Sequence, residues 1–166
     1  GFGRQRHAEE LDPASCDDPV SIEAHDRHIL LHGVIDRVDT NDEARTFCVL
    51  DYKSGSDIPT LDEIRHGPSI QLPVYIMAAE HLLGDEYGFA AAGYFQTKDA
   101  ADCGRKNWLG DATRAKAAGA PSRSTKLEPA EVNDWLAQEK QRIAGTVMGI
   151  EAGEFVVVAV RASGTG

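Results

Sequence analysis

The chain has 166 residues, of which 42% are hydrophobic and 27% are charged, and its formal net charge is −10. This length is enough for one domain with a hydrophobic core, and the composition is that of a globular protein. The negative charge excludes a general nucleic-acid coat protein, although it does not exclude an enzyme that meets nucleic acid through metal-bound carboxylates. No apolar run reaches the length of a membrane span and no signal segment opens the chain, so we expect no membrane partner and a cytoplasmic location.

The three cysteines, Cys16, Cys48 and Cys103, are widely spaced and odd in number. The sequence has no Cys-x-x-Cys pair, which argues against a zinc ribbon or a disulfide framework. Cys48 lies in a predicted strand, and we expect it to be an ordinary buried thiol. The chain begins Gly-Phe-Gly without methionine, which indicates a segment excised from a longer protein.

The first predicted elements are three successive antiparallel strands between Val20 and Lys53. Residues 20–24 form the first, and the other two form a hairpin with arms at residues 31–39 and 46–55, both rich in β-branched or aromatic residues. The polar residues 40–45 between the arms predict the turn. Gly33 marks a position where we expect the backbone to bend or to be approached closely.

The hairpin brings acidic residues together. Side chains alternate faces along a strand, so Asp51 and Lys53 share one face. An antiparallel register around the turn sets Asp36 opposite Asp51 and Val38 opposite Val49. Two carboxylates directly opposite each other destabilise a sheet, unless a divalent cation lies between them. The alternative interpretation is a solvated strand end, because Asp-x-Lys is a common tripeptide.

After the hairpin, the sequence predicts a short helical turn at residues 61–67 and a helix at residues 69–83 that ends at Gly84. Gln71 and Tyr75 are four residues apart and therefore lie on one face of this helix. Pro73 is expected in the first helical turn, where its missing N–H does least harm. The expected core stripe of the helix is Leu72, Ile76, Ala79 and Leu83.

Residues 89–97 predict another strand, which a strand–helix–strand connection would pair in parallel with the second hairpin arm.

Residues 98–126 contain seven basic and three acidic residues without a clear period, and we expect a basic, partly disordered loop. Trp108 in this segment either stacks on a base or packs in a satellite cluster. A long helix follows from Pro129 to Gly153, with an apolar side that includes Trp135 and Ile150, and residues 155–160 predict a final strand. The candidate DNA-binding residues all lie in the basic segment 98–126: Arg105, Lys106, Arg114 and Lys116.

Three motifs in order, Gly33-Val-Ile-Asp-Arg-Val-Asp39, Asp51-Tyr-Lys-Ser-Gly55 and Gln71-Leu-Pro-Val-Tyr75, resemble the RecB-type nucleases of the PD-(D/E)xK superfamily. The nearest look-alikes are nuclease domains of bacterial helicase–nuclease subunits. The segment that begins Phe2-Gly is similar to the end of the Glu-x-x-Phe-Gly motif of that family. The resemblance implies one domain over residues 1–166, with the α/β fold of a restriction-endonuclease-like core: a mixed central sheet flanked by helices.

The resemblance also implies a function, that of a deoxyribonuclease of the exonuclease type that depends on Mg²⁺ or Mn²⁺. It would act on DNA in recombination and repair, with a helicase domain or a helicase–nuclease partner subunit. Asp36, Asp51 and the backbone carbonyl of Tyr52 would bind the metal ion. Lys53 would orient the attacking water or neutralise the charge that develops on the phosphate. Gln71 and Tyr75 would contact DNA or support Lys53. Taken alone, these last two are equally a partly buried amide and a tyrosine at the rim of the core.

The sequence departs from the family pattern in two ways. The family's upstream acidic metal ligand would precede residue 1, so we expect this segment alone to be inactive. The cysteine cluster of the iron–sulfur centre found in many relatives is also missing, and such a cluster is expected only in the full-length protein. A non-catalytic DNA-binding or scaffolding module of a helicase–nuclease complex is the alternative function, and an unrelated α/β binding domain is the third. The intact Asp36, Asp51 and Lys53 favour the nuclease.

Overall fold

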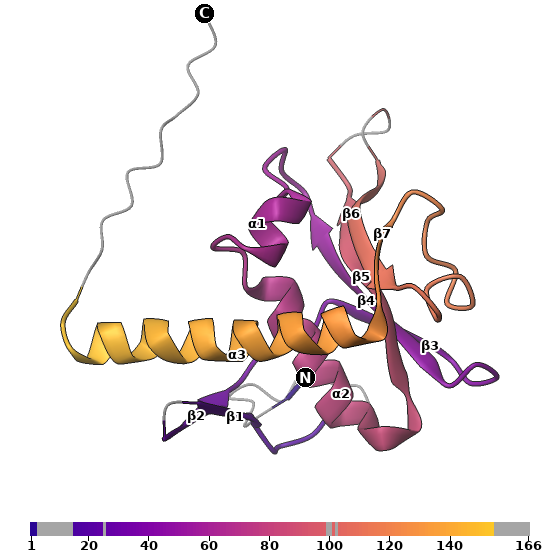
Figure 1. Cartoon of the computed structure of the whole chain (residues 1–166). Helices are drawn as coiled ribbons and strands as arrows, with labels where there is room; N and C mark the ends of the chain where they lie inside the picture. Colours follow the sequence, from indigo (N-terminus) through magenta and orange to yellow (C-terminus); the bar gives the residue numbers. More distant parts are fainter. Residues whose placement is uncertain (3–14, 25, 99–100, 102, 155–166) are drawn as a thin grey trace, which may run out of the picture.

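The computed structural model describes residues 1–2, 15–24, 26–98, 101 and 103–154, so the predicted strand at residues 155–160 lies outside the described part. The centre of the fold is a mixed sheet with the strand order β3-β4-β5-β6-β7 (Figure 1). The β4–β5 and β6–β7 pairs are parallel and the β3–β4 and β5–β6 pairs are antiparallel. The predicted α/β class and the parallel pairing after the helix are therefore confirmed. The strands are β3 (Arg37–Asn41), β4 (Thr46–Lys53), β5 (Gly88–Gln96), β6 (Gly104–Asp111) and β7 (Thr125–Leu127).

The hairpin of β3 and β4 has the predicted register. Val38 is the partner of Val49, and Asn41 is the partner of Thr46 across a four-residue turn. The strand β3 begins only at Arg37, so the predicted first arm is too long, and Asp36 lies one residue before the paired region.

The predicted three-stranded meander is wrong, because β1 (Val20–Ala24) and β2 (Arg27–Leu31) form a separate two-stranded sheet. The chain leaves β2 and meets Phe2 at Gly33, where the two residues exchange N–H to O bonds of 2.9 and 3.0 Å. A Cβ atom at Gly33 would lie 3.0 Å from Cζ of Phe2, which confirms the close approach expected there. This second pairing takes the chain away from β2 before β3 begins.

Three α-helices complete the described fold: α1 (Leu61–Arg65), α2 (Gln71–Leu83) and α3 (Pro129–Glu151), with the 3₁₀ turn η1 (Gly84–Glu86) after α2. Thr60 and Glu63 form a capping box that starts α1, and Gly84 ends α2 as predicted, at a positive φ of 64° that suits glycine. No helix in the described residues combines the length and the apolar character that a membrane span requires.

The helix α2 lies between the central sheet and the small β1–β2 sheet, and α3 crosses beside it (Figure 1). Leu72, Ile76 and Ala79 pack with strand residues and with the first half of α3, while Leu83 is only partly buried at the edge. Met77 and Ala78 turn to β1 instead. The apolar side of α3 is buried as far as Ile143, but Ile150 is exposed. We call the side of the central sheet that α2 and α3 cover the helix face.

The prediction of a loop at residues 98–126 is wrong, because this segment contains β6 and β7. Residues 108–111 are buried one after another, so β6 shows no alternation of polar and apolar residues. Trp108 packs with Cys48 and Leu50 on the opposite side of the sheet, which we call the loop face, and its Nε1 donates to the carbonyl of Tyr94 at 3.1 Å. Its packing interpretation is therefore confirmed. Ala118 and Ala120, from residues 112–124, cover part of the loop face.

Candidate active site

The end of β4 places Asp51 and Lys53 on the helix face, as the strand alternation predicts. Asp51 is only 1% exposed, and its Oδ2 lies 2.7 Å from Nζ of Lys53. Lys53 also donates a 2.6 Å hydrogen bond to Oε1 of Gln71 at the start of α2. The ammonium group is therefore fixed between a strand carboxylate and a helix amide.

Asp36 joins this group from the position just before β3. The register Arg37 to Leu50 makes Asp36 the next residue along, across from Asp51. Its exposed carboxylate accepts a 2.9 Å hydrogen bond from the backbone N–H of Tyr52. A residue in an antiparallel strand points its N–H and C=O toward the same neighbour, so the carbonyl of Tyr52 points to the Asp36 side as well.

The charges of the two carboxylates affect each other. Burial raises the pKa of Asp51 above 3.8, the ion pair with Lys53 opposes the rise, and the negative charge of Asp36 adds to it. The expected increase in carboxylate pKa is therefore confirmed. Its largest cause is burial, however, and the repulsion on which the expectation was based is a smaller contribution.

The predicted helix residues lie beside these groups. Nε2 of Gln71 donates to the hydroxyl of Tyr75 at 3.1 Å, which continues the chain of contacts from Lys53. Burial raises the pKa of Tyr75, and the nearby charges of Asp36 and Asp51 raise it further. Of the two roles considered for Gln71, the structure shows the contact that supports Lys53.

Two further residues of the site have no sequence signal. Tyr94 of β5 is the register partner of Asp51 and is completely buried. Nζ of Lys53 lies 5.3 Å from the centre of its ring, and its hydroxyl is 3.1 Å from Oγ of Ser69. Only the β4–β5 register, which follows from the fold, identifies this neighbour of Lys53.

The residues present fit a hard divalent cation. Oδ2 of Asp51 is buried, and the ammonium group of Lys53 lies 2.7 Å from it and balances its charge. The carboxylate of Asp36 lies close enough to raise the pKa of Asp51, and a cation bound between these two hard oxygen donors would relieve that repulsion. Within the described residues, no three His, Cys, Asp or Glu side chains gather at one point. Two carboxylates and a carbonyl leave room for water, as Mg²⁺ prefers.

The four candidate DNA-binding residues do not form one surface. Arg105 and Lys106 are neighbours in β6 and point to opposite faces: Arg105 pairs with Phe95, and Lys106 pairs with Tyr94. The guanidinium of Arg114 lies against Gly88, at the opposite end of the sheet from the carboxylates. Lys116 is exposed in the loop that follows.

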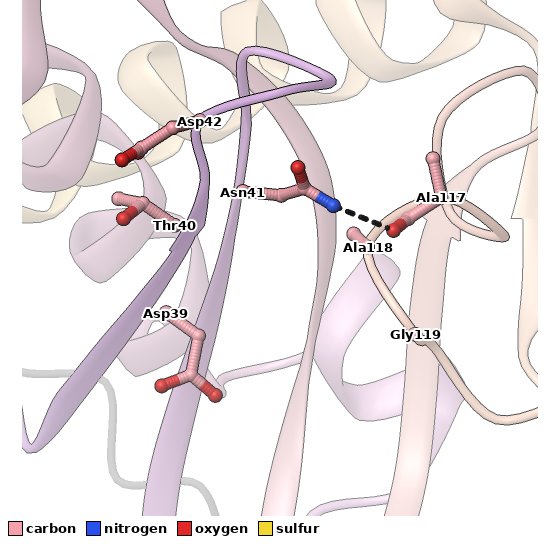
Figure 2. A pocket seen from close by; sticks show the side chains of 7 residues that line it. All are labelled: Asp39, Thr40, Asn41, Asp42, Ala117, Ala118 and Gly119. Carbon is pink, nitrogen blue, oxygen red and sulfur yellow. Dashed lines mark hydrogen bonds between the residues drawn. The ribbon is translucent and has the colours of Figure 1, made fainter.

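A separate hollow lies between the end of β3 and residues 117–119 (Figure 2). Its carboxylates are already bound, because Asp39 pairs with Arg37 and Asp42 accepts from the hydroxyl of Tyr87. Asn41 closes part of it with a 3.1 Å bond to the carbonyl of Ala117. Asp39 and Asp42 are also exposed, so the hollow lacks a buried carboxylate like that of Asp51.

A mixed sheet that presents two carboxylates and a lysine at the end of a hairpin has the arrangement of the restriction-endonuclease-like fold. The profile of the PD-(D/E)XK nuclease superfamily matches residues 2–158, and the chain belongs to this superfamily. It is also 41% identical, over 64 residues, to an ATP-dependent helicase/deoxyribonuclease subunit from Lachnoclostridium phytofermentans. That region covers 37% of this chain and only 6% of the relative. No solved structure gives a significant match.

Proposed function

We propose that this chain is a DNA nuclease that hydrolyses phosphodiester bonds with Mg²⁺ or Mn²⁺, and that it cuts from DNA ends. The observation that supports the proposal most strongly is the convergence of Asp36, Asp51 and Lys53, with the carboxylate of Asp51 buried against the ammonium group of Lys53. Superfamily membership supports nuclease chemistry in general.

Asp36, Asp51 and the carbonyl of Tyr52 would hold the metal ion. When bound, the ion lowers the pKa of a coordinated water and stabilises negative charge on the phosphate. The Tyr52 N–H holds the exposed carboxylate of Asp36 in place, and burial fixes that of Asp51. The chain thus orients both acidic groups before DNA arrives.

Lys53 would act on the phosphate or on the attacking water. An ammonium group has three donors, and Asp51 and Gln71 occupy two directions around Nζ. The third donor remains for a phosphate or water oxygen, since the side chain is 25% exposed. A fixed positive charge of this kind stabilises the charge that develops in the transition state. Gln71 and Tyr75 would position Lys53 rather than react.

The name of the relative, a helicase/deoxyribonuclease subunit, supports extending the proposal to a partner. We propose that the nuclease works beside a DNA helicase, which would supply it with unwound ends in recombination or repair. The non-catalytic scaffold remains the competing function, and it predicts DNA binding without cleavage.

The test uses the protein in its full natural length, with linear and covalently closed circular DNA and either metal ion. Wild type should degrade linear DNA and leave closed circles intact, and chelation should stop the reaction. Calorimetric titration with Mn²⁺ should show binding that Asp36→Ala and Asp51→Ala remove. Glu43→Ala, which changes an exposed carboxylate in the turn of the same hairpin, is the matched control and should bind normally. If wild type cuts no DNA with either ion but binds it, the scaffold function replaces this proposal.

A further inference from the structure

The loop face carries aromatic and cationic side chains close to the active site. Tyr52 lies between Asp51 and Lys53 in β4, so its side chain points to the loop face while theirs point to the helix face. Tyr52 is the register partner of Phe95, and Phe95 is the partner of Arg105. Arg37 reaches the same row from β3. We call these four residues, Arg37, Tyr52, Phe95 and Arg105, the Tyr52 row.

The ring of Tyr52 is both exposed and fixed. The residue is 41% exposed, although its neighbours Leu50 and Cys48 on the same face are buried. Its hydroxyl accepts a 3.1 Å hydrogen bond from Nη1 of Arg37, and its ring meets that of Phe95 edge to face at 5.8 Å. Because the ring is exposed and already held on two sides, it offers a flat surface to a ligand, and little side-chain entropy is lost when the ligand binds.

Cations flank the ring at both ends of the row. Arg37 binds Asp39 through Nε, but its Nη2 makes no hydrogen bond to any described residue. Arg105 donates to the carbonyl of Gly119 and lies over the ring of Trp108 at 5.3 Å, and no described carboxylate pairs with it. In a chain with a net charge of −10, an aromatic ring between two guanidinium groups is complementary to a polyanion that carries planar bases.

The row also lies next to the carboxylates. The N–H of Tyr52 bonds to Asp36 at 2.9 Å, so the backbone of one residue connects the ring to the proposed metal site. The ring and the Asp51 carboxylate point to opposite faces, but β3 begins only at Arg37, the partner of Leu50, so no residue of β3 pairs with Tyr52. A DNA strand that passes around this open edge of β4 can lead from a phosphate at Asp36 and Asp51 to the ring of Tyr52. A base in a duplex is already stacked on both sides, whereas an unpaired base has a free face.

We propose that the Tyr52 row is a nucleobase-binding subsite that stacks one unpaired base beside the cleaved phosphate. It rests on the proposed nuclease function for its position in the reaction, but not for its test. Tyr52 supplies the stacking face, Phe95 and Arg37 hold it in place, and Arg105 attracts the adjoining phosphate.

The experiment measures binding in chelator, where no cleavage takes place, so it is independent of nuclease activity. Fluorescence anisotropy compares a labelled twelve-nucleotide thymidine strand with an abasic strand of the same length, which has the phosphates but no bases. Wild type should bind the thymidine strand more tightly. Tyr52→Ala should weaken that binding about tenfold, the loss expected for one stacked base, and leave the abasic strand unchanged. Tyr52→Phe, which keeps the ring, should bind nearly as well as wild type.

Tyr87 provides a matched control, because it lies under Arg45 at 5.6 Å as a similar tyrosine–arginine pair near the opposite end of the sheet. Tyr87→Ala should leave both affinities unchanged. The subsite is refuted if wild type does not distinguish the two strands, a result that requires no folded variant. Equal weakening of both strands by Tyr52→Ala would refute it too, because it would indicate only a loss of charge or of structure.

Discussion

Replacing Lys53 with methionine tests the role of the ion pair. Asp51 is 1% exposed and depends on Lys53, at 2.7 Å, for charge balance. Removing one partner of a fully buried ion pair costs about 3–5 kcal/mol of folding free energy. Lys53 itself is one quarter exposed, so water compensates in part, and we expect a loss of about 2 kcal/mol at pH 7. The catalytic loss should be at least about 100-fold, which corresponds to about 2.7 kcal/mol of transition-state stabilisation.

The stability loss should depend on pH with a definite sign. The pKa of Asp51 in the folded protein is already raised above 3.8, and loss of Lys53 raises it further. A carboxylate whose pKa is raised by folding destabilises the folded state as the pH rises from its unfolded pKa to its folded pKa, and the penalty disappears at lower pH, where the group is protonated in both states. Lys53→Met should therefore unfold at nearly the wild-type urea concentration below about pH 4, and progressively earlier as the pH rises to 7.

The control is the double variant Asp51→Asn with Lys53→Met. A neutral amide removes the charge that lysine balances, so at pH 7 the double variant should be more stable than Lys53→Met alone. The reasoning is refuted if Lys53→Met loses the same stability at pH 4 and pH 7, or if the double variant is no more stable than the single one.

Three other predictions follow from the packing around the site. Tyr94→Leu should reduce the cleavage rate by about tenfold, because it removes the ring beneath Lys53, whereas Tyr94→Phe should remain near wild type; equal rates for the two variants would show that the ring does not position Lys53. Gly93→Ala should lower the free energy of unfolding by about 1–3 kcal/mol, because the new Cβ would lie 2.4 Å from the indole of Trp108. Urea titration measures this loss, and unchanged stability would contradict the close packing. Burial raises the pKa of Cys48 to about 11, so iodoacetamide at pH 8 should alkylate the exposed Cys103 before Cys48. Mass spectrometry measures the two rates of alkylation, and equal rates would contradict the burial of Cys48.

The sequence predicts the hairpin and the helix α2 because their signals are local. Alternating faces and a polar turn define the Val38–Val49 register, and a periodic apolar stripe with Gly84 at its end defines the helix. These elements bring Asp36, Asp51, Lys53 and Gln71 together, so most of the candidate site follows from short segments of the chain.

The remaining features depend on contacts between distant residues. The strand β6 is buried on both faces at residues 108–111, so it shows no alternation of polar and apolar residues. Its sequence, GRKNWLGD, also lacks the apolar run by which a fully buried strand is recognised. The β1–β2 sheet is separate from the central sheet, and the chain between β2 and β3 pairs with Phe2 at Gly33, a contact with no local pattern. Tyr94 becomes part of the site only through the parallel β4–β5 register, which places it beside Asp51.

The most direct test of the shared cation site is a crystal structure of the full-length protein grown with Mn²⁺, with anomalous scattering data that identify the manganese position. We predict a manganese peak between the carboxylates of Asp36 and Asp51, with oxygen ligands at about 2.0–2.3 Å, and the ammonium group of Lys53 close by but not bound to the metal. A peak only in the hollow lined by Asp39 and Asp42, or no peak near Asp51 at saturating Mn²⁺, would contradict the account.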